Sequence, residues 1–371
     1  MAAQDNNTEK YLKRALRLAK KGEGLVSPNP LVGAVLVKDN RIIGEGYHQH
    51  FGGDHAEVDA LKNVTESPEG STLYINLEPC CHFGKTPPCT EALIKAGIKK
   101  VVAAMPDPNP LVSGKGFSRL KKTGIEVETG LLFEESLRIN ESYFTWITQR
   151  RPFITLKIAQ SLDGKITSYT GKSKWITGEE ARRFAHRLRF EYDAVLVGIK
   201  TVLADDPSLD YLVPKLSLSL VSHKRYFKIV LDNQARIPLS AKLWKGKGRV
   251  VVATTEKAPS SNLRRLEEKG ARILVAGAER VAIKKLLNLL YKMEVGSVLV
   301  EGGAETFGSF VDEKMVDLLY VFQSPIVLGN RNAKSSIAGK GFPTPEEALR
   351  FKFKAMRHFG PDSLSIYKPY L

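Results

Sequence analysis

The stretch that organises this chain opens with His55-Ala56-Glu57 and closes with Pro79-Cys80-Cys81-His82-Phe83-Gly84-Lys85-Thr86-Pro87-Pro88-Cys89. The chain has 371 residues, and all three of its cysteines lie in the last eleven residues of this stretch. Two thiolates and one imidazole make a three-ligand zinc site that leaves one coordination position open. The pattern therefore predicts zinc ligands at His55, Cys80 and Cys89, with Glu57 beside the metal but not bound to it.

The order His-x-Glu, then Pro-Cys, then a second Cys is typical of zinc-dependent deaminases. Zinc with an open position lowers the pKa of a bound water, and a neighbouring carboxylate such as Glu57 moves the proton. An alternative is that the cysteines pack as small apolar residues. Their clustering beside a His-x-Glu argues against that alternative, and the odd cysteine count argues against a disulfide framework.

Length and composition favour a globular protein of two domains, residues 1–150 and 151–371, joined near Arg150-Arg151-Pro152. No run approaches the ~18 apolar residues of a membrane helix. The polar N-terminus has no signal-peptide pattern, so we expect a cytoplasmic protein with reduced thiols. The net charge of +16 fits either a polyanionic partner such as RNA or anionic small substrates. The basic residues form no long run, which favours a solvated basic surface.

Hydrophobic periodicity predicts alternating strands and helices in both halves. The first half has predicted helices at 8–22, 55–64, 89–97 and 133–149, and strands at 31–37, 41–48, 72–76 and 100–105. The second has predicted strands at 153–160, 193–197, 228–231, 249–253, 272–275 and 297–300, with a final strand at 318–322, and helices at 178–190, 280–291 and 302–310. This alternation indicates a three-layer α/β domain in the first half. Cys89 begins a predicted helix, where a thiolate is favoured.

The spacing between the two cysteine ligands, Cys80 and Cys89, narrows the choice among deaminase families. Nucleic-acid deaminases carry Pro-Cys-x-x-Cys, whereas eight residues separate Cys80 from Cys89 here. That loop, together with blocks at 28–35, 46–48 and 52–57, resembles the signature of the riboflavin-biosynthesis pyrimidine deaminases. The resemblance covers most of residues 10–145 and implies a cytidine-deaminase-like α/β/α fold. It also implies that Asn29, His48, His82 and Lys85 contact a phosphorylated pyrimidine.

Residues 151–371 resemble the reductase half of the bifunctional riboflavin enzymes, which has a dihydrofolate-reductase-like α/β fold. The matching blocks lie at 155–165, 173–177, 201–209, 230–232 and 300–303. The resemblance implies that NADPH contacts Ala159, Trp175, Thr201, Asp205, Gly303, Ala304, Glu305, Thr306, Phe307, Gly308 and Ser309. It implies that the substrate contacts Ser173, Arg189, Leu209 and Glu301. A Gly-Gly turn between strand and helix suits a phosphate, but the absence of Gly-x-Gly-x-x-Gly argues against a Rossmann domain.

One block departs from the resemblance. After Leu209 the family usually continues Thr-x-Arg, and the arginine serves the substrate phosphate. This chain has Asp210-Tyr211-Leu212 instead, with Lys215, Lys224 and Arg225 as candidates to compensate. Loss of a charge-assisted phosphate contact costs about 1.5–3 kcal/mol. We therefore expect a raised Michaelis constant for the reductase, or a weakened reductase half, unless one of these cations substitutes.

The resemblance implies a bifunctional enzyme of riboflavin biosynthesis with one zinc per deaminase domain. Its expected reactions are deamination of 2,5-diamino-6-(5-phosphoribosylamino)pyrimidin-4(3H)-one, then NADPH-dependent reduction to 5-amino-6-(5-phosphoribitylamino)uracil. No nucleic acid and no membrane are expected as partners, and we expect a homo-oligomer. One alternative is a nucleic-acid base deaminase with an appended domain. A second is a non-catalytic zinc-binding scaffold, against which the intact Glu57 argues.

Overall fold

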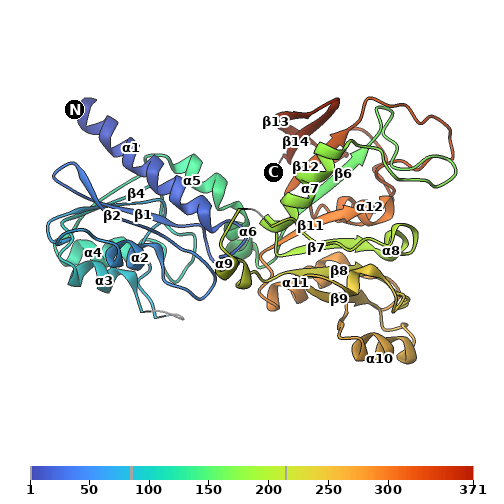
Figure 1. The fold of residues 1–371 in the computed structure, drawn as a ribbon, viewed down its shortest axis with the longest axis horizontal. Helices are drawn as coiled ribbons and strands as arrows, with labels where there is room; N and C mark the ends of the chain where they lie inside the picture. Colours follow the sequence, from blue (N-terminus) through green and yellow to red (C-terminus); the bar gives the residue numbers. More distant parts are fainter. Residues whose placement is uncertain (1, 84–86, 214, 371) are drawn as a thin grey trace. The chain divides into compact units, whose positions relative to one another are not determined.

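The computed structural model describes residues 2–83, 87–213 and 215–370, with side chains described from residue 7 onward. The chain forms two compact units (Figure 1). The first comprises the residues up to Arg150 together with Leu216–Lys224, and the second comprises Arg151–Lys215 and the residues from Arg225 onward.

The first unit is built on a five-stranded sheet in the order β2-β1-β3-β4-β5. Its strands are β1 (Gly33–Lys38), β2 (Arg41–Tyr47), β3 (Thr72–Ile75), β4 (Lys100–Ala103) and β5 (Glu126–Thr129). β1 pairs antiparallel with β2 and β3, whereas β3, β4 and β5 are parallel. β1 is a continuous apolar run because both of its faces are covered.

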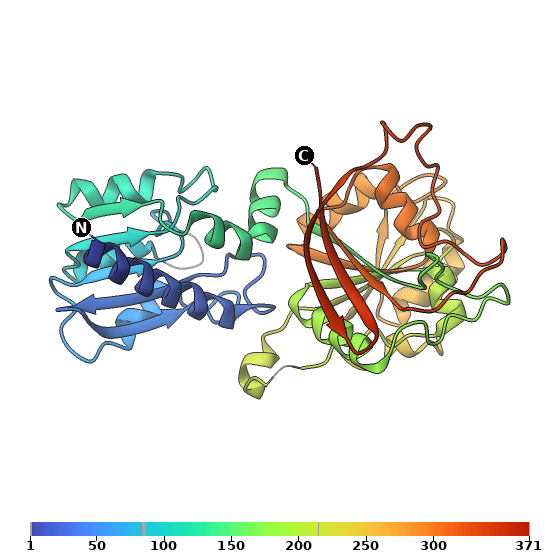
Figure 2. The same cartoon turned by 90° about the horizontal axis from the view of Figure 1, so that it is seen from above.

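Helices cover both faces of this sheet (Figures 1 and 2). The elements are α1 (Ala2–Ala19), η1 (Lys20–Gly22), α2 (Ala56–Lys62), α3 (Cys89–Lys95), α4 (Lys115–Lys122), α5 (Phe133–Ile139), α6 (Glu141–Gln149) and α9 (Leu218–Ser222). On one face Tyr11 and Leu18 of α1 pack against Val35. On the other, Ala60 of α2 and Leu93 of α3 join a separate apolar cluster with the sheet. The predicted three-layer α/β/α architecture is therefore confirmed.

The second unit has a nine-stranded sheet in the order β10-β9-β8-β7-β11-β6-β12-β14-β13. The strands are β6 (Phe153–Gln160), β7 (Ala194–Gly198), β8 (Phe227–Leu231), β9 (Arg249–Thr254), β10 (Arg272–Val275), β11 (Ser297–Gly302), β12 (Leu318–Gln323), β13 (Phe351–Phe359) and β14 (Asp362–Pro369). From β10 to β12 all pairs are parallel. β14 and β13 complete the sheet in antiparallel register.

Helices also cover both faces of the second sheet. They are α7 (Glu179–Glu191), α8 (Ile199–Asp205), α10 (Ser260–Glu268), α11 (Ile283–Lys292) and α12 (Ala304–Asp312), with a short η2 (Lys242–Trp244). Leu286 of α11 and Phe310 of α12 pack into the main core. Ala181 and Ala185 of α7 pack on the other side, against Phe322. This mixed α/β fold agrees with the expectation for the second half.

Several sequence predictions are wrong in detail. The helix predicted over 133–149 is two helices separated at Asn140, whose side chain bonds the backbone N–H and carbonyl of Leu31. The strand predicted to be the last is followed by the hairpin β13–β14, and residues 352–358 of β13 are exposed on both faces of the strand. Helices α4, α8, α9 and α10 and strand β5 were missed, and most of these are short. None of the described helices is long and apolar enough to cross a membrane.

Candidate active sites

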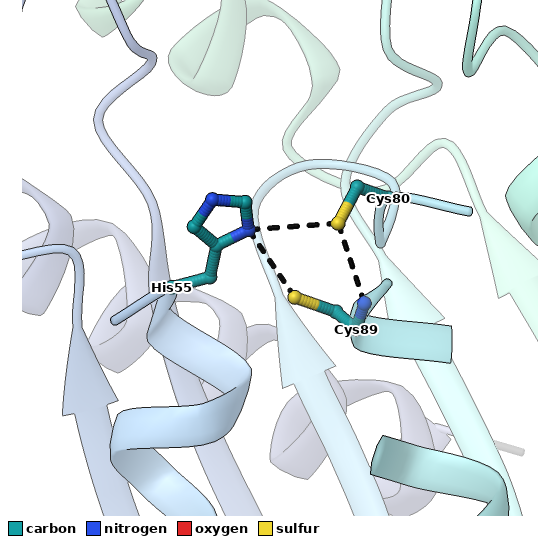
Figure 3. A group of neighbouring side chains, drawn as sticks. All are labelled: His55, Cys80 and Cys89. Carbon is teal, nitrogen blue, oxygen red and sulfur yellow. Dashed lines mark hydrogen bonds between the residues drawn. The ribbon is translucent and has the colours of Figure 1, made fainter. Parts of the chain in front are cut away.

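The three predicted metal ligands meet at one point of the first unit. His55 immediately precedes α2, Cys89 is the first residue of α3, and Cys80 follows β3 in the loop between them. The Nδ1 atom of His55 lies 3.5 Å from the Sγ of Cys80 and 3.2 Å from the Sγ of Cys89 (Figure 3). The three ligand atoms all lie within 4.8 Å of one another. Such a cluster suits a single tetrahedral ion.

The chemistry of these donors fits zinc. A hydrogen bond from Cys89 and the neighbouring His55 lower the pKa of the Cys80 thiol to about 4. The Cys80 thiolate in turn raises the pKa of His55 to about 9. The site thus stabilises a sulfur anion beside a nitrogen donor, and a bound zinc ion would replace the shared proton. Cys81 takes no part, because its Sγ faces the carbonyl of Leu111 at 3.8 Å.

Glu57 lies beside the ligands without joining them. It is the second residue of α2 and is 3% exposed. Burial raises the pKa of its carboxyl to about 7, although a hydrogen bond with Cys89 acts in the opposite direction. A buried carboxyl with a pKa near neutrality exchanges protons readily at physiological pH. This placement suits a proton shuttle next to the metal.

His48 is fixed as a neutral imidazole at the rim of this cluster. Its Nδ1 bonds the carbonyl of Asp54 at 2.8 Å, so Nδ1 carries the proton. Its Nε2 lies 3.0 Å from Nδ2 of Asn29 and accepts from that amide. Burial lowers the pKa of His48 to about 4. The ring meets that of His55 edge-on, with centroids 5.5 Å apart. Asn29 and His48 therefore lie next to the metal ligands.

The loop between the two cysteines carries the other two predicted substrate residues. Nδ1 of His82 is buried and has no hydrogen-bond partner in the described part of the protein. A buried polar atom without a partner is costly unless a ligand satisfies it. Lys85 lies outside the described residues, so its position is not described here.

Three buried polar residues that sequence reasoning missed hold this site in shape. Asn76 accepts from the N–H of Gly33 and donates to the carbonyl of Leu31, and Asn140 also bonds Leu31. Glu78 accepts from three backbone N–H groups, those of Asp107, Gly114 and Phe117. The sequence signal that could have identified Glu78 is an acidic residue that follows a buried strand and directly precedes Pro79-Cys80.

The second unit contains a cavity of about 1210 Å³ at the carboxyl ends of β6, β7, β8 and β11. Ligands of open parallel sheets bind at this edge. It is lined by fourteen of the fifteen residues expected to bind cofactor or reductase substrate: Ala159, Ser173, Trp175, Arg189, Thr201, Asp205, Leu209, Glu301, Gly303, Ala304, Glu305, Thr306, Phe307 and Ser309. Gly308 instead faces Ala338, where a Cβ atom would meet the backbone oxygen at 2.1 Å.

A buried ion pair lies inside this cavity. Nε and Nη2 of Arg189 bond the two carboxylate oxygens of Glu301 at 2.7 and 2.9 Å, and Nη1 bonds the carbonyl of Asp210 at 2.8 Å. Burial would raise the pKa of Glu301, but the charge and hydrogen bonds of Arg189 outweigh it and lower the pKa to about 2. Burial also lowers the pKa of Lys157, a cavity residue that sequence reasoning missed.

The turn between β11 and α12 suits a phosphate group. Gly303 has φ +47°, a conformation that favours glycine, and the nine-residue helix α12 begins at the next residue. Gly198, at the end of β7, approaches so closely that a Cβ atom would lie 2.5 Å from Oγ1 of Thr306. The start of α12 therefore lies close to the end of β7 and lines the cavity, and a helix start there suits an anionic group.

The residues Asp210-Tyr211-Leu212, which differ from the family's Thr-x-Arg, are held in place by a buried ion pair. Asp210 forms an ion pair at 2.9 Å with Lys228, whose side chain is fully buried and also bonds the carbonyls of Leu243 and Lys245. Of the three cations considered as substitutes, Arg225 pairs with Glu294, and none of them lines the described cavity. Two other cations near Ser173 do line it, Lys174 and Arg182, and Arg182 lies over the ring of Trp175.

Comparison with known proteins finds a family match for each half of the chain. The family described as "Cytidine and deoxycytidylate deaminase zinc-binding region" matches residues 5–105, and the "RibD C-terminal domain" matches residues 152–365. The riboflavin biosynthesis protein RibD of Aquifex aeolicus is 45% identical over 361 residues, which cover 97% of this chain and 98% of the relative. The chain belongs to the RibD family.

Further members of the RibD family show the same extent of similarity. RibD of Escherichia coli strain K12 is 38% identical over 95% of this chain and 97% of its own length. The structure of Acinetobacter baumannii RibD is similar with a TM-score of 0.89 at 36% identity, and 99% of each chain is covered. A Thermotoga maritima structure, described as a diaminohydroxyphosphoribosylaminopyrimidine deaminase/5-amino-6-(5-phosphoribosylamino)uracil reductase, has a TM-score of 0.84 at 37% identity and covers 98% and 99% of the two chains. This chain is accordingly a bifunctional deaminase and reductase of riboflavin biosynthesis.

Proposed function

We propose that the first unit removes the 2-amino group of 2,5-diamino-6-(5-phosphoribosylamino)pyrimidin-4(3H)-one and that the second reduces the ribosyl group of the product. The final product is 5-amino-6-(5-phosphoribitylamino)uracil, and the reductant is NADPH. The observation that carries the deaminase half is the convergence of His55, Cys80 and Cys89 with the buried Glu57 beside them.

In the first unit, His55, Cys80 and Cys89 would hold the zinc ion, which supplies a Lewis acid that lowers the pKa of a water. The Glu57 carboxyl accepts the proton of the attacking water and returns it to the leaving amine, so that oxygen replaces nitrogen and ammonia departs. The buried Glu57 is suited to this exchange because its pKa is about 7.

The neighbouring polar groups orient the pyrimidine. Asn29 still offers an amide oxygen when its Nδ2 donates to His48. The unpartnered Nδ1 of His82 supports a contact with the same ligand. Lys85, on the same loop, is proposed to meet the ribose phosphate, for which a lysine point charge is sufficient.

In the second unit, NADPH supplies the hydride that reduces C1′ of the ring-opened ribose. The start of α12 would bind a cofactor phosphate, while Trp175, Thr201 and Asp205 border the same cavity. Ser173, Arg189, Leu209 and Glu301 bind the sugar phosphate, and the Arg189–Glu301 pair fixes both charged groups. Lys174 and Arg182 are the cations that we assign to the phosphate in place of the usual arginine.

Two variants separate the activities. Glu57→Gln should retain bound zinc, as measured by atomic absorption, and lose ammonia release, because the amide does not accept the proton. The same variant should still oxidise NADPH when it is given the deaminated intermediate. A fully active Glu57→Gln protein, or a zinc-free preparation with full deaminase activity, would contradict the proposed mechanism.

The alternative of a nucleic-acid base deaminase is not favoured, because the reductase half matches over residues 152–365. A cytoplasmic location is proposed on the three free cysteines, which a reducing compartment keeps as thiols. A homo-oligomer remains a proposal that sedimentation velocity tests directly.

A further inference from the structure

The helix α7 carries two cations of the reductase cavity but has no capping side chain of its own. Arg182 and Arg189 both belong to this helix and line the cavity. The residue that precedes the helix is Gly178, which has no side chain that could bond the first backbone N–H groups. A helix that begins in this way depends on a partner from elsewhere in the fold.

The C-terminal hairpin supplies that partner. β13 and β14 are joined by the two-residue turn Gly360-Pro361, and Asp362 is the first residue after the turn. The Oδ2 atom of Asp362 accepts a hydrogen bond from the backbone N–H of Gly178 at 2.6 Å. Asp362 is 1% exposed, and the helix dipole favours a carboxylate at this end of α7.

Apolar contacts hold the hairpin against the same helix. Ala181 and Ala185 of α7 form a buried cluster with Leu364 of β14. The ring of Phe184 in α7 lies 4.9 Å from that of Phe359 in β13, measured between centroids. The hairpin therefore packs along the first half of α7 and does not touch only its first residue.

The residue before Gly178 connects this anchoring to the cavity. The backbone carbonyl of Thr177 accepts a hydrogen bond from Nη1 of Arg182. The guanidinium of Arg182 also lies over the ring of Trp175, 4.4 Å from its centroid. Among the described residues the bond to Thr177 is the only hydrogen bond of this guanidinium, so Nε and Nη2 are available to a ligand. Thr177 and Arg182 line the cavity, whereas Asp362 does not.

We propose that Asp362 is a positioning residue for substrate binding by the reductase: by holding the start of α7, it fixes Arg182 where the sugar phosphate binds. The inference rests on the proposed reductase function and on the assignment of Arg182 to that phosphate. Asp362 does not touch the substrate, so its contribution passes through Arg182.

Steady-state kinetics of the full-length protein, with NADPH and the deaminated ribosylaminouracil phosphate, test this role. Asp362→Ala should raise KM for the sugar phosphate about tenfold and leave kcat at saturation within about twofold of the wild type. Arg182→Gln should raise the same KM at least as much, and the Asp362→Ala/Arg182→Gln double variant should be no worse than Arg182→Gln alone. Asp362→Asn keeps an acceptor oxygen and should recover most of the loss.

Asp193→Ala is the matched control. Asp193 is 4% exposed and accepts from the backbone N–H groups of Gly296 and Ser297 at 2.6 and 3.1 Å. These residues lie at the amino ends of β7 and β11, whereas the cavity lies at the carboxyl ends. The control loses a buried carboxylate and should keep the wild-type KM. Hydrogen exchange in peptides that contain β6 and β11 verifies that each variant is folded.

An unchanged KM in folded Asp362→Ala, or a double variant in which the two single losses multiply, would overturn the proposal. If Asp362→Ala does not fold, Asp362→Ser takes its place, because the shorter side chain also leaves the N–H of Gly178 without its acceptor.

Binding of inorganic phosphate, followed by the fluorescence of Trp175 with Trp175→Phe as the blank, requires no turnover. The dissociation constant should rise about tenfold in Asp362→Ala and stay unchanged in Asp193→Ala. Equal constants in Asp362→Ala and the wild type would overturn the positioning role. A wild type that binds phosphate but does not reduce the intermediate would instead contradict the proposed reductase function.

Discussion

Replacement of Glu301 by Gln removes one charge of a buried pair and leaves the Arg189 guanidinium without its counter-ion. The side chains of Arg189 and Glu301 are 10% and 7% exposed and share two hydrogen bonds. The pKa of Glu301 falls from an ordinary 4.5 to about 2 in the fold, which corresponds to roughly 3 kcal/mol of stability at neutral pH. Breaking a buried pair by removing one partner typically costs about 3–5 kcal/mol, which agrees.

The pH dependence of this loss follows from the sign of the shift. A carboxyl with a depressed pKa stabilises the fold fully above its unfolded value of 4.5, and the contribution disappears as the pH falls towards about 2. The difference between wild type and Glu301→Gln should therefore be about 3 kcal/mol at pH 7 and roughly 2.5 kcal/mol at pH 4. It should narrow further at every lower pH at which the wild type remains folded.

Urea titration read by hydrogen exchange in peptides that contain β6 and β11 measures this difference for the second unit alone. The matched control is Glu179→Gln, which removes a pair with Arg183 on the surface of α7, where the carboxylate is 74% exposed. That control should cost less than about 1 kcal/mol. A Glu301→Gln protein as stable as the control at pH 7, or a difference that widens as the pH falls, would refute the reasoning.

Three further outcomes are expected. Cys89→Ser should lose bound zinc and the release of ammonia, but it should still oxidise NADPH when given the deaminated intermediate. Stoichiometric zinc retained in this variant, as measured by atomic absorption, would count against Cys89 as a ligand. Lys228→Met should destabilise the second unit by about 2–4 kcal/mol, because Asp210 loses its buried partner. It should also lower the reductase kcat/KM, because the carbonyl of Asp210 positions Arg189. An unchanged urea midpoint and unchanged kinetics would be inconsistent with that role of Lys228. Glu78→Ala should lower the free energy of unfolding of the first unit by about 2–3 kcal/mol, since three backbone N–H groups lose their acceptor. It should also weaken zinc binding in a competition with a chelator. A zinc affinity equal to that of the wild type would exclude support of the metal loop by Glu78.

The metal ligands were predictable because chemistry restricts them to few residue types at characteristic spacings. His55, Cys80 and Cys89 form such a pattern. The strands β6 and β10 were also predicted with the same bounds that the structure has. The parallel order of β8, β7, β11 and β6 depends on contacts between distant residues, so periodicity within a segment does not reveal it.

The polar residues that support the sites were not predictable in the same way. Asn140 lies within a helical pattern, yet its side chain bonds Leu31 across the fold and ends the helix. Lys228 lies in an apolar strand and is fully buried only because Asp210 and two carbonyls surround its ammonium group.

Mass spectrometry of the products formed from the diaminopyrimidine ribotide, with and without NADPH, tests the central claim most directly. Without NADPH, the protein should replace one amino group by oxygen, release ammonia and stop at the ribosylaminouracil phosphate. With NADPH, the same preparation should add two hydrogens and yield the ribitylaminouracil phosphate, with one NADPH oxidised for each product molecule. Reduction of the ribotide before any ammonia is released, or no change in its mass under either condition, would contradict a deaminase and a reductase acting in sequence on one chain.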